Sequence, residues 1–317
     1  MAKRLRPWTV LLTAVLAASG PRIMSSPAPE HPETGHGRRS ETIAGSLPFL
    51  YDLYTFRGDT FTTVVATFAV QAGDLVREDV DGGVRYRFSV SLAVVDTVHF
   101  IVTHAHDSIF VEVARPLPRD HLLYTAVQVQ APPSDETIHR VIMFDAVTPG
   151  IGQLYRAPTP IPDYDGPDLM LSDIALAQPD AGIGWKRGDV TLPFLPTGRF
   201  PSSAFDAYYE IYNLPARNAY STVITIERID EAGAVLARVL DIRFAGESVA
   251  GSDAVVAERR RIESSLDRGR YRMTVTVTDL STGQTASRSR NFEVHSTHGA
   301  TMVPALNVSR GRFMTRR

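Results

Sequence analysis

The sequence predicts an all-β protein made of two tandem antiparallel β-sandwiches of the immunoglobulin or fibronectin III type. Three observations predict this fold class. From residue 47 onward, short runs rich in Val, Ile, Thr, Tyr and Phe are broken by Gly, Pro and Asp. Almost no stretch repeats apolar residues at helical spacing. A length of 317 residues exceeds what one small core needs and favours about two domains.

The amino-terminal residues have the anatomy of a secretory signal peptide. Basic residues precede an apolar run from Trp8 to Ser19, which is shorter than the roughly 20 residues that a membrane span needs. We therefore expect residues 1–19 to be removed on export, leaving a mature chain without a transmembrane anchor in the periplasm or outside the cell. The composition of residues 20–46 predicts a disordered spacer, and residues 298–317 are expected to form a basic flexible tail.

The overall composition narrows the choice of partners. The chain has 33 Lys+Arg against 35 Asp+Glu, so it lacks the basic excess of a nucleic-acid surface, and we expect no nucleic-acid partner. It has no Cys, which excludes disulfides and a lipid-modified cysteine although the expected compartment would permit disulfides.

Residues 47–147 are predicted to form the first sandwich from about seven short strands. The candidate strands are 49–56, 60–70, 84–96, 98–105, 108–115, 122–130 and 137–147. Residues 79–83, DVDGG, fall where a hairpin turn is needed, because Gly tolerates positive φ. The Pro-rich residues 148–167 then predict an interdomain linker, because proline removes ladder donors and stiffens the chain.

Residues 168–297 are predicted to form the second sandwich. The candidate strands are 169–177, 204–214, 219–230, 235–244, 257–266, 271–279 and 285–294. Tyr271 stands at the start of a late strand, as does the tyrosine of a tyrosine corner, whose hydroxyl bonds to upstream backbone; the alternative is an ordinary exposed hairpin.

The two halves also resemble each other, which favours a diverged duplication. Residues 86–96 match residues 220–230 in their Tyr, their apolar alternation and their Asp. A second match pairs Val127, Val129 and Phe144 with Val275, Val277 and Phe292 at one constant offset. Alternating strands match one another easily, so a chance likeness is the alternative.

Three stretches of the second half carry a family resemblance. LMLSDIALA (169–177), YYEIYNL (208–214) and the Gly-x-Tyr hairpin around Tyr271 resemble the β-sandwich portion of bacterial secreted proteins called GWxTD domain-containing proteins. The naming motif is missing, because Gly184-Trp185 is followed by Lys-Arg-Gly. The resemblance implies an exported cell-envelope protein and supplies no catalytic residues.

Residues 103–107, THAHD, look like the start of a metal-binding loop. Metallo-β-lactamase-like hydrolases use His-x-His-x-Asp-His after a strand, so that one turn converges on two metals. Here Asp107 follows His106 without the required spacer. On a strand, His104 and His106 share one face, and we expect a solvent-facing histidine pair and no functional metal.

Three other fragments look like sites but lack part of their pattern. GIGWKRG (182–188) imitates a dinucleotide loop without a following helix, so no cofactor is predicted. DYDGPD (163–168) resembles a calcium loop without its later bidentate Glu; an Asp-rich turn is the main interpretation and a calcium site the alternative. ERRRIE (258–263) is predicted to be a solvated strand face rather than a phosphate or carboxylate site.

The aromatic strand candidate 204–214 supplies the only predicted binding residues. Its core face is expected to hold Phe205 and Tyr209, which leaves Tyr208, Glu210 and Tyr212 on the outer face. Two tyrosines flanking a carboxylate can stack on a sugar or accept a peptide or added strand. The alternative is that the first domain or residues 182–188 cover this face.

No catalytic residues are predicted. The sequence favours an exported, non-enzymatic binding or assembly protein of the cell envelope, whose partner is an envelope protein or a polysaccharide. The main alternative is a hydrolase or carbohydrate-active accessory protein with a site built from loops, and a purely structural spacer is a third.

Overall fold

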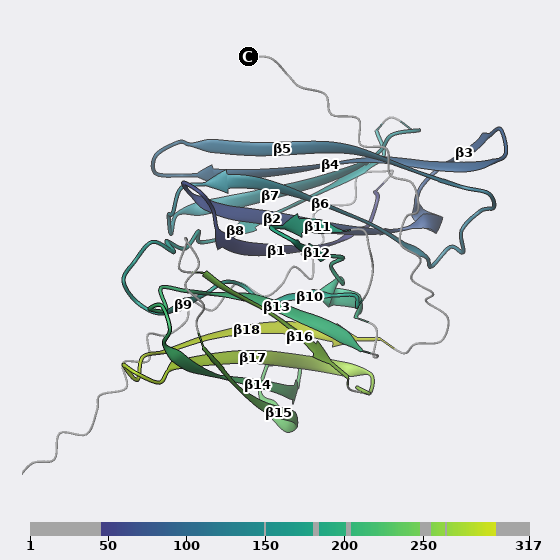
Figure 1. The fold of residues 1–317 in the computed structure, drawn as a ribbon. Coiled ribbons are helices and arrows are strands. Elements are labelled where there is room, and N and C mark those ends of the chain that lie inside the picture. Colours follow the sequence, from purple (N-terminus) through teal and green to yellow (C-terminus); the bar gives the residue numbers. More distant parts are fainter. Residues whose placement is uncertain are drawn as a thin grey trace, which may run out of the picture.

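The computed structural model describes residues 46–148, 150–179, 184–200, 204–247, 255–263 and 265–295. These residues form β-strands and two 3₁₀ helices, η1 (Ala72–Asp74) and η2 (Thr197–Arg199). The predicted all-β class is therefore confirmed (Figure 1). The predicted signal peptide, the carboxy-terminal tail and all but the last residue of the predicted spacer lie outside the described residues. In the described part of the chain, no helix is long and apolar enough to cross a membrane.

The first sandwich packs a three-stranded sheet against a five-stranded one. The first sheet has the order β1-β2-β6, and in the second β4 pairs with β5 on one side and with β7 and the short β3 on the other, with β8 beside β7. The strands are β1 (Leu50–Arg57), β2 (Thr62–Gln71), β3 (Arg77–Val80), β4 (Gly83–Asp96), β5 (Val102–Val113), β6 (Leu122–Ala131), β7 (Thr137–Asp145) and β8 (Gly152–Pro158).

Side-chain alternation explains how these strands form one core. Along β4, every second residue from Val84 to Val94 is buried, and the residues between them face outward. Because the side-chain period of a strand is two, this pattern fixes which face of the sheet lies inward. The predicted hairpin turn before β4 is confirmed, since Val80 pairs with Gly83 and Gly82 has a φ of +83°.

The second sandwich packs two four-stranded sheets. One has the order β10-β13-β16, with β9 also pairing β13, and the other has the order β15-β14-β17-β18. A two-stranded hairpin, β11-β12, is inserted between β10 and β13. The strands are β9 (Met170–Leu171), β10 (Ala175–Ala177), β11 (Trp185–Arg187), β12 (Val190–Leu192), β13 (Phe205–Tyr212), β14 (Ala219–Ile229), β15 (Val235–Glu247), β16 (Val255–Ile262), β17 (Gly269–Asp279) and β18 (Thr285–Val294).

Both sandwiches have the same strand topology. The orders β1-β2-β6 and β5-β4-β7-β8 of the first correspond to β10-β13-β16 and β15-β14-β17-β18 of the second. The matched stretches 86–96 and 220–230 lie in β4 and β14, which occupy equivalent places, so this match agrees with a duplication. The constant-offset match is wrong, because it pairs strands that are not equivalent. Val127 lies in β6 of the three-stranded sheet, whereas Val275 lies in β17, whose equivalent in the first sandwich is β7 of the five-stranded sheet.

The tyrosine corner predicted at Tyr271 is present. The Tyr271 hydroxyl donates a hydrogen bond of 2.8 Å to the backbone carbonyl of Asp267, and the ring is buried against Phe292. The Ser281–Gln284 turn then joins β17 to β18, with Gly283 at a φ of +75°. This hairpin therefore belongs to the sandwich and is not a separate exposed ribbon.

The predicted linker at residues 148–167 needs correction. Residues 152–158 form β8, which pairs along its length with β7, and Ile161 belongs to the first core. A Pro-rich segment can form a strand here because β8 is the last strand of its sheet, where a missing N–H on the outer side costs no ladder bond. The chain therefore leaves the first sandwich only after Ile161.

The two sandwiches pack directly on each other as four layers of sheet (Figure 1). The outer face of the sheet β1-β2-β6 meets the outer face of the sheet containing β10 and β13, with the β11-β12 hairpin beside them. All eight residues of β13 are buried, and so are all but the last of β2. A strand is buried on both faces only when both are covered, so the inter-sandwich contact is part of the folded core.

Candidate functional site

Strand β13 places the predicted binding residues in the interface between the sandwiches. Phe205 and Tyr209 face the second core, as predicted. Tyr208, Glu210 and Tyr212 face the other way, but their exposed fractions are only 1%, 1% and 0%. The hypothesis of an exposed platform is therefore wrong for this structure, and the alternative of a covered face describes it, because the first sandwich and the β11-β12 hairpin lie over these side chains.

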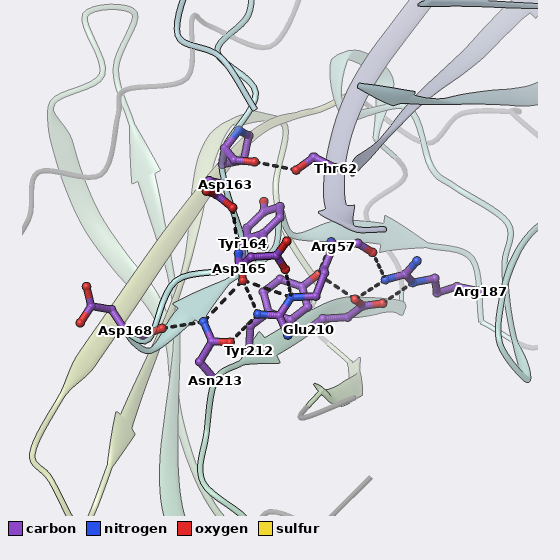
Figure 2. Close-up of polar contacts among 11 residues, drawn as sticks. Arg57, Thr62, Asp163, Tyr164, Asp165, Asp168, Arg187, Glu210, Tyr212 and Asn213 are labelled. Carbon is purple, nitrogen blue, oxygen red and sulfur yellow. Dashed lines mark hydrogen bonds and ion pairs between the residues drawn. The ribbon is translucent and has the colours of Figure 1, made fainter. Parts of the chain in front are cut away.

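Glu210 is the centre of a polar network within this interface (Figure 2). One carboxylate oxygen accepts hydrogen bonds from Arg187 Nε at 2.7 Å and the Tyr208 hydroxyl at 2.6 Å. The other accepts from Arg187 Nη2 at 2.8 Å and the Tyr212 hydroxyl at 2.7 Å. Its backbone N–H donates to Ser172 Oγ at 2.9 Å. With two donors on each oxygen, the carboxylate is fully satisfied by the protein itself.

The same network reaches into the first sandwich. Arg187 Nη2 donates to the backbone carbonyl of Arg57 at 2.5 Å, and the Arg57 backbone N–H donates to the Tyr212 hydroxyl at 2.9 Å. The Arg57 side chain lies over the Tyr212 ring at 4.6 Å and donates to the Tyr164 carbonyl at 3.1 Å and to Asn213. Glu210, on β13, is thus joined through shared donors to β1, so the cluster ties the two sandwiches together.

Burial and charge set the protonation of these groups. Burial raises the pKa of the Tyr208 and Tyr212 hydroxyls, and the neighbouring negative charge of Glu210 raises each pKa further. Burial disfavours the charge of Arg187, but the hydrogen bonds and charge of Glu210 outweigh burial and raise the pKa of its guanidinium. Both tyrosines therefore stay protonated and donate to the Glu210 carboxylate, in addition to the bidentate pair that Arg187 forms with it.

A second polar cluster surrounds Thr55, two residues before Arg57 on β1. Asp173 accepts hydrogen bonds from the backbone N–H of Thr55 at 2.7 Å and from its hydroxyl at 2.8 Å. The Tyr164 hydroxyl is 2.8 Å from Thr55 Oγ1. Tyr164 comes from the DYDGPD turn and is 2% exposed. This turn therefore places a tyrosine between the sandwiches.

Aromatic rings fill the space between these polar clusters and the β11-β12 hairpin. Trp185 stacks on Phe56, with ring centroids 5.1 Å apart, and Phe194 stacks on Tyr54 at 4.9 Å. The Trp185 Nε1–H donates to Gln128 Oε1 at 2.6 Å. Trp185, in the predicted loop 182–188, thus packs against the first sandwich. No dinucleotide-binding helix follows this loop in the described residues, because the next elements are β12 and η2.

A cavity of about 370 Å³ opens beside this aromatic cluster. It lies between the outer face of the sheet β1-β2-β6 and the β11-β12 insertion. Most of its wall is apolar, and its polar residues include Asp52, Thr67, Asp107, Gln178 and Lys186. We call it the interdomain cleft; its size falls in the range of small-ligand sites. Its lining residues are Leu50, Tyr51, Asp52, Thr67, Phe68, Ala69, Asp107, Ile109, Leu122, Leu123, Tyr124, Thr125, Ala126, Gln178, Gly184, Trp185, Lys186, Leu192, Pro193, Phe194 and Pro196.

The histidines of THAHD lie where strand periodicity places them. His104 and His106 are exposed on β5, and Asp107 points to the other side, where it lines the interdomain cleft. Among the described residues, no group of three or more His, Cys, Asp or Glu is placed to hold a metal ion, either here or in the DYDGPD turn. The run is one continuous strand, Val102–Val113, rather than the two predicted.

The ERRRIE prediction is wrong in part. Glu258 is 8% exposed and accepts a hydrogen bond from the Tyr220 hydroxyl, because it lies on the same face of β16 as Val256 and Ile262, which face the second core. Arg259 and Arg261 are both ion-paired with Asp206 on the neighbouring strand β13. Cross-strand pairing therefore uses charges that the sequence pattern assigned to solvent.

Sequence reasoning missed three residues that shape this region. Arg57 and Arg187 were not singled out, because an arginine on a strand end gives no sign that a buried carboxylate lies opposite it. His139 was also missed: it is 4% exposed, lies 3.1 Å from the Tyr51 hydroxyl, and burial lowers its pKa to about 4. Its signal was its place on the apolar face of the candidate strand 137–147.

Comparisons with known proteins give a fold likeness only. No family model and no curated protein sequence matches the chain. Solved structures that match include a Bacteroides uniformis β-glucuronidase, with 10% identity and a TM-score of 0.25 over 72% of this chain and 26% of that one. Another is red sea bream transglutaminase, with 12% identity and a TM-score of 0.22 over 78% and 31%. The chain spans less than a third of either protein, and likeness at this level carries no argument about function.

Proposed function

We propose that the protein is an exported, non-enzymatic binding or assembly protein of the cell envelope that holds a segment of a partner protein in its interdomain cleft. Export is proposed from the pattern of residues 1–19 and from the resemblance of the second half to GWxTD domain-containing proteins. The observation that carries the binding role is the cleft itself. It lies between two sandwiches joined by buried polar and aromatic contacts, so its walls are held in place before any ligand arrives.

The chemistry of the walls favours a protein segment over a polysaccharide. Sugars are commonly held by stacking on open aromatic faces. Here one face of Trp185 is covered by Phe56, and Phe194 is stacked on Tyr54. The cavity lining also includes leucines and prolines, with Thr125 and Gln178 among the polar groups. An apolar side chain with hydrogen-bonding backbone beside it matches such a lining.

One observation favours the alternative, a hydrolase. Two carboxylates, Asp52 and Asp107, line the same cleft. However, Asp52 is buried, and its two oxygens accept hydrogen bonds from the backbone N–H of Thr197 at 2.9 Å and from the Thr197 hydroxyl. Because both oxygens of Asp52 are used to hold η2 in place, Asp52 is poorly placed to act on a substrate. Binding is therefore the better supported function.

The test combines capture in the native envelope with measurement on purified proteins. A photo-crosslinker at Thr125, on the cleft wall, should capture one defined protein, whereas a matched crosslinker at the exposed Ser289 on β18 should not. The captured protein is then purified and titrated into the full chain carrying Trp8→Phe, so that Trp185 is the only tryptophan and reports from the cleft. Gln178→Ala and Lys186→Ala should weaken binding several-fold.

Three results would contradict the proposal. Binding of a purified envelope polysaccharide with the same dependence on Gln178 and Lys186 would replace the protein segment with a sugar ligand. Fragments released from envelope material by the wild-type chain but not by Asp107→Asn would make the protein a hydrolase. Equal capture from Thr125 and Ser289 would remove the cleft as the binding site.

A further inference from the structure

Strand β15 forms an edge of the second sandwich, on the side that lies away from the first sandwich (Figure 1). It pairs with β14 on one side, and no strand in the described part of the chain pairs with its other side. The strand is 13 residues long, and Val235, Leu236 and Val239 are 52%, 62% and 42% exposed. Such an edge is a template for pairing with another strand unless it is protected.

Only the second part of β15 is a regular strand. Leu240–Glu247 pairs without interruption with Ala219–Ile226 of β14, whereas the register shifts twice before Leu240. These irregularities end any regular ladder at the start of β15, as bulges on natural edge strands do. The stretch from Leu240 onward has no such protection.

The side chains of this stretch alternate between two environments. Leu240, Ile242 and Phe244 pack against the edge of the second core and remain partly exposed. Asp241 and Arg243 lie on the opposite, exposed face. An added strand would therefore complete the apolar face on one side and meet a negative and a positive charge on the other.

This pattern is complementary to itself in one antiparallel register. With a two-fold axis through Ile242, Leu240 lies opposite Phe244 of a second copy, and Ile242 lies opposite its own equivalent. Asp241 then lies opposite Arg243 of the second copy, and the symmetry forms this ion pair twice. Centring the axis on Asp241 or Arg243 instead would place like charges directly opposite, which is destabilising.

We propose that the protein forms a homodimer through antiparallel pairing of β15 about Ile242. The sheets β15-β14-β17-β18 of the two copies then join into one continuous sheet, the β-augmentation mode of association. The interface lies on the outermost layer of the second sandwich, so the clefts of both copies stay open. The dimer therefore goes beyond the proposed function, because it presents two clefts and makes binding bivalent. A short ladder buries less than a standard interface, so a weak dimer that forms only at high protein concentration is expected.

The test is a charge exchange measured by sedimentation equilibrium on the full chain. Asp241→Arg places arginines opposite each other, and Arg243→Asp places aspartates opposite each other, so each variant alone should dimerise at least about tenfold more weakly than the wild type. Mixing the two variants restores opposite charges at both contacts and should restore dimerisation as a heterodimer. The matched control is Glu112→Arg on β5, the equivalent strand of the first sandwich, which should leave the wild-type dimer unchanged.

The outcomes separate the proposal from its rivals. A wild-type chain that stays monomeric at several hundred micromolar overturns it, and so does a dimer that neither charge reversal weakens. A mixture of Asp241→Arg and Arg243→Asp that stays as monomeric as each variant alone overturns the proposed register. Thermal unfolding of each variant is the folding control, and an unchanged transition shows that loss of association is not loss of folding. Because this test does not involve Gln178 or the cleft, its failure and that of the proposed function are distinguishable.

Discussion

Neutralising the buried carboxylate with Glu210→Gln should destabilise the whole two-sandwich unit. The carboxylate accepts four hydrogen bonds, two of them from the Arg187 guanidinium. A glutamine keeps one acceptor oxygen but points an NH₂ group at donors, so at least one charged hydrogen bond is lost, at about 1.5–3 kcal/mol. Arg187 is also left without its counter-charge, and breaking a buried pair costs about 3–5 kcal/mol.

The lower end of that range is expected, because the Arg187 side chain is 26% exposed and water can solvate part of its charge. We therefore expect Glu210→Gln to lower the free energy of unfolding by about 3 kcal/mol. Removing the partner as well, with Arg187→Met, should recover part of this loss, and the double-mutant cycle should give a coupling of about 2 kcal/mol. The measurement is urea unfolding followed by both Trp185 fluorescence and circular dichroism.

The control is Glu112→Gln, which removes the surface ion pair with Arg85 and should cost less than about 1 kcal/mol. Two results would refute the reasoning. One is a Glu210→Gln effect no larger than that of the control. The other is a strictly additive double mutant, which would mean that the contributions of Arg187 and Glu210 to stability do not depend on each other.

Three further predictions concern other described residues. Burial lowers the pKa of His139 from 6.5 to about 4, so between these pH values the unfolded chain binds more protons than the folded one. The free energy of unfolding should therefore fall by about 3 kcal/mol as the pH drops from 6.5 to about 4, and His139→Gln should flatten this pH dependence. Tyr271→Phe removes the hydrogen bond to the Asp267 carbonyl and should cost about 1–2 kcal/mol in the same urea assay, and no change would deny the tyrosine corner a stabilising role. Elemental analysis of the purified protein should find no stoichiometric transition metal, and about one zinc per chain that disappears on replacing His104 and His106 would contradict this.

Much of each sandwich could be predicted from local pattern. Alternation of period two placed Phe205 and Tyr209 on the core face of β13, and strand spacing with its turn signals predicted two all-β halves. The place of Tyr271 before a late strand predicted its hydroxyl contact to upstream backbone. These features depend on residues close together in the chain, where period and turn chemistry decide the outcome.

The candidate site depended on contacts that local pattern does not contain. Periodicity put Tyr208, Glu210 and Tyr212 on the outer face of their strand, but whether an outer face meets solvent or another sheet depends on packing between segments more than 100 residues apart. The same holds for residues 152–158, where proline content indicated a linker and an edge position in the sheet permitted a strand. The sequence by itself determined which side chains share a face; only the tertiary structure decided what covers that face, because burial is a property of two surfaces and a strand encodes just one of them.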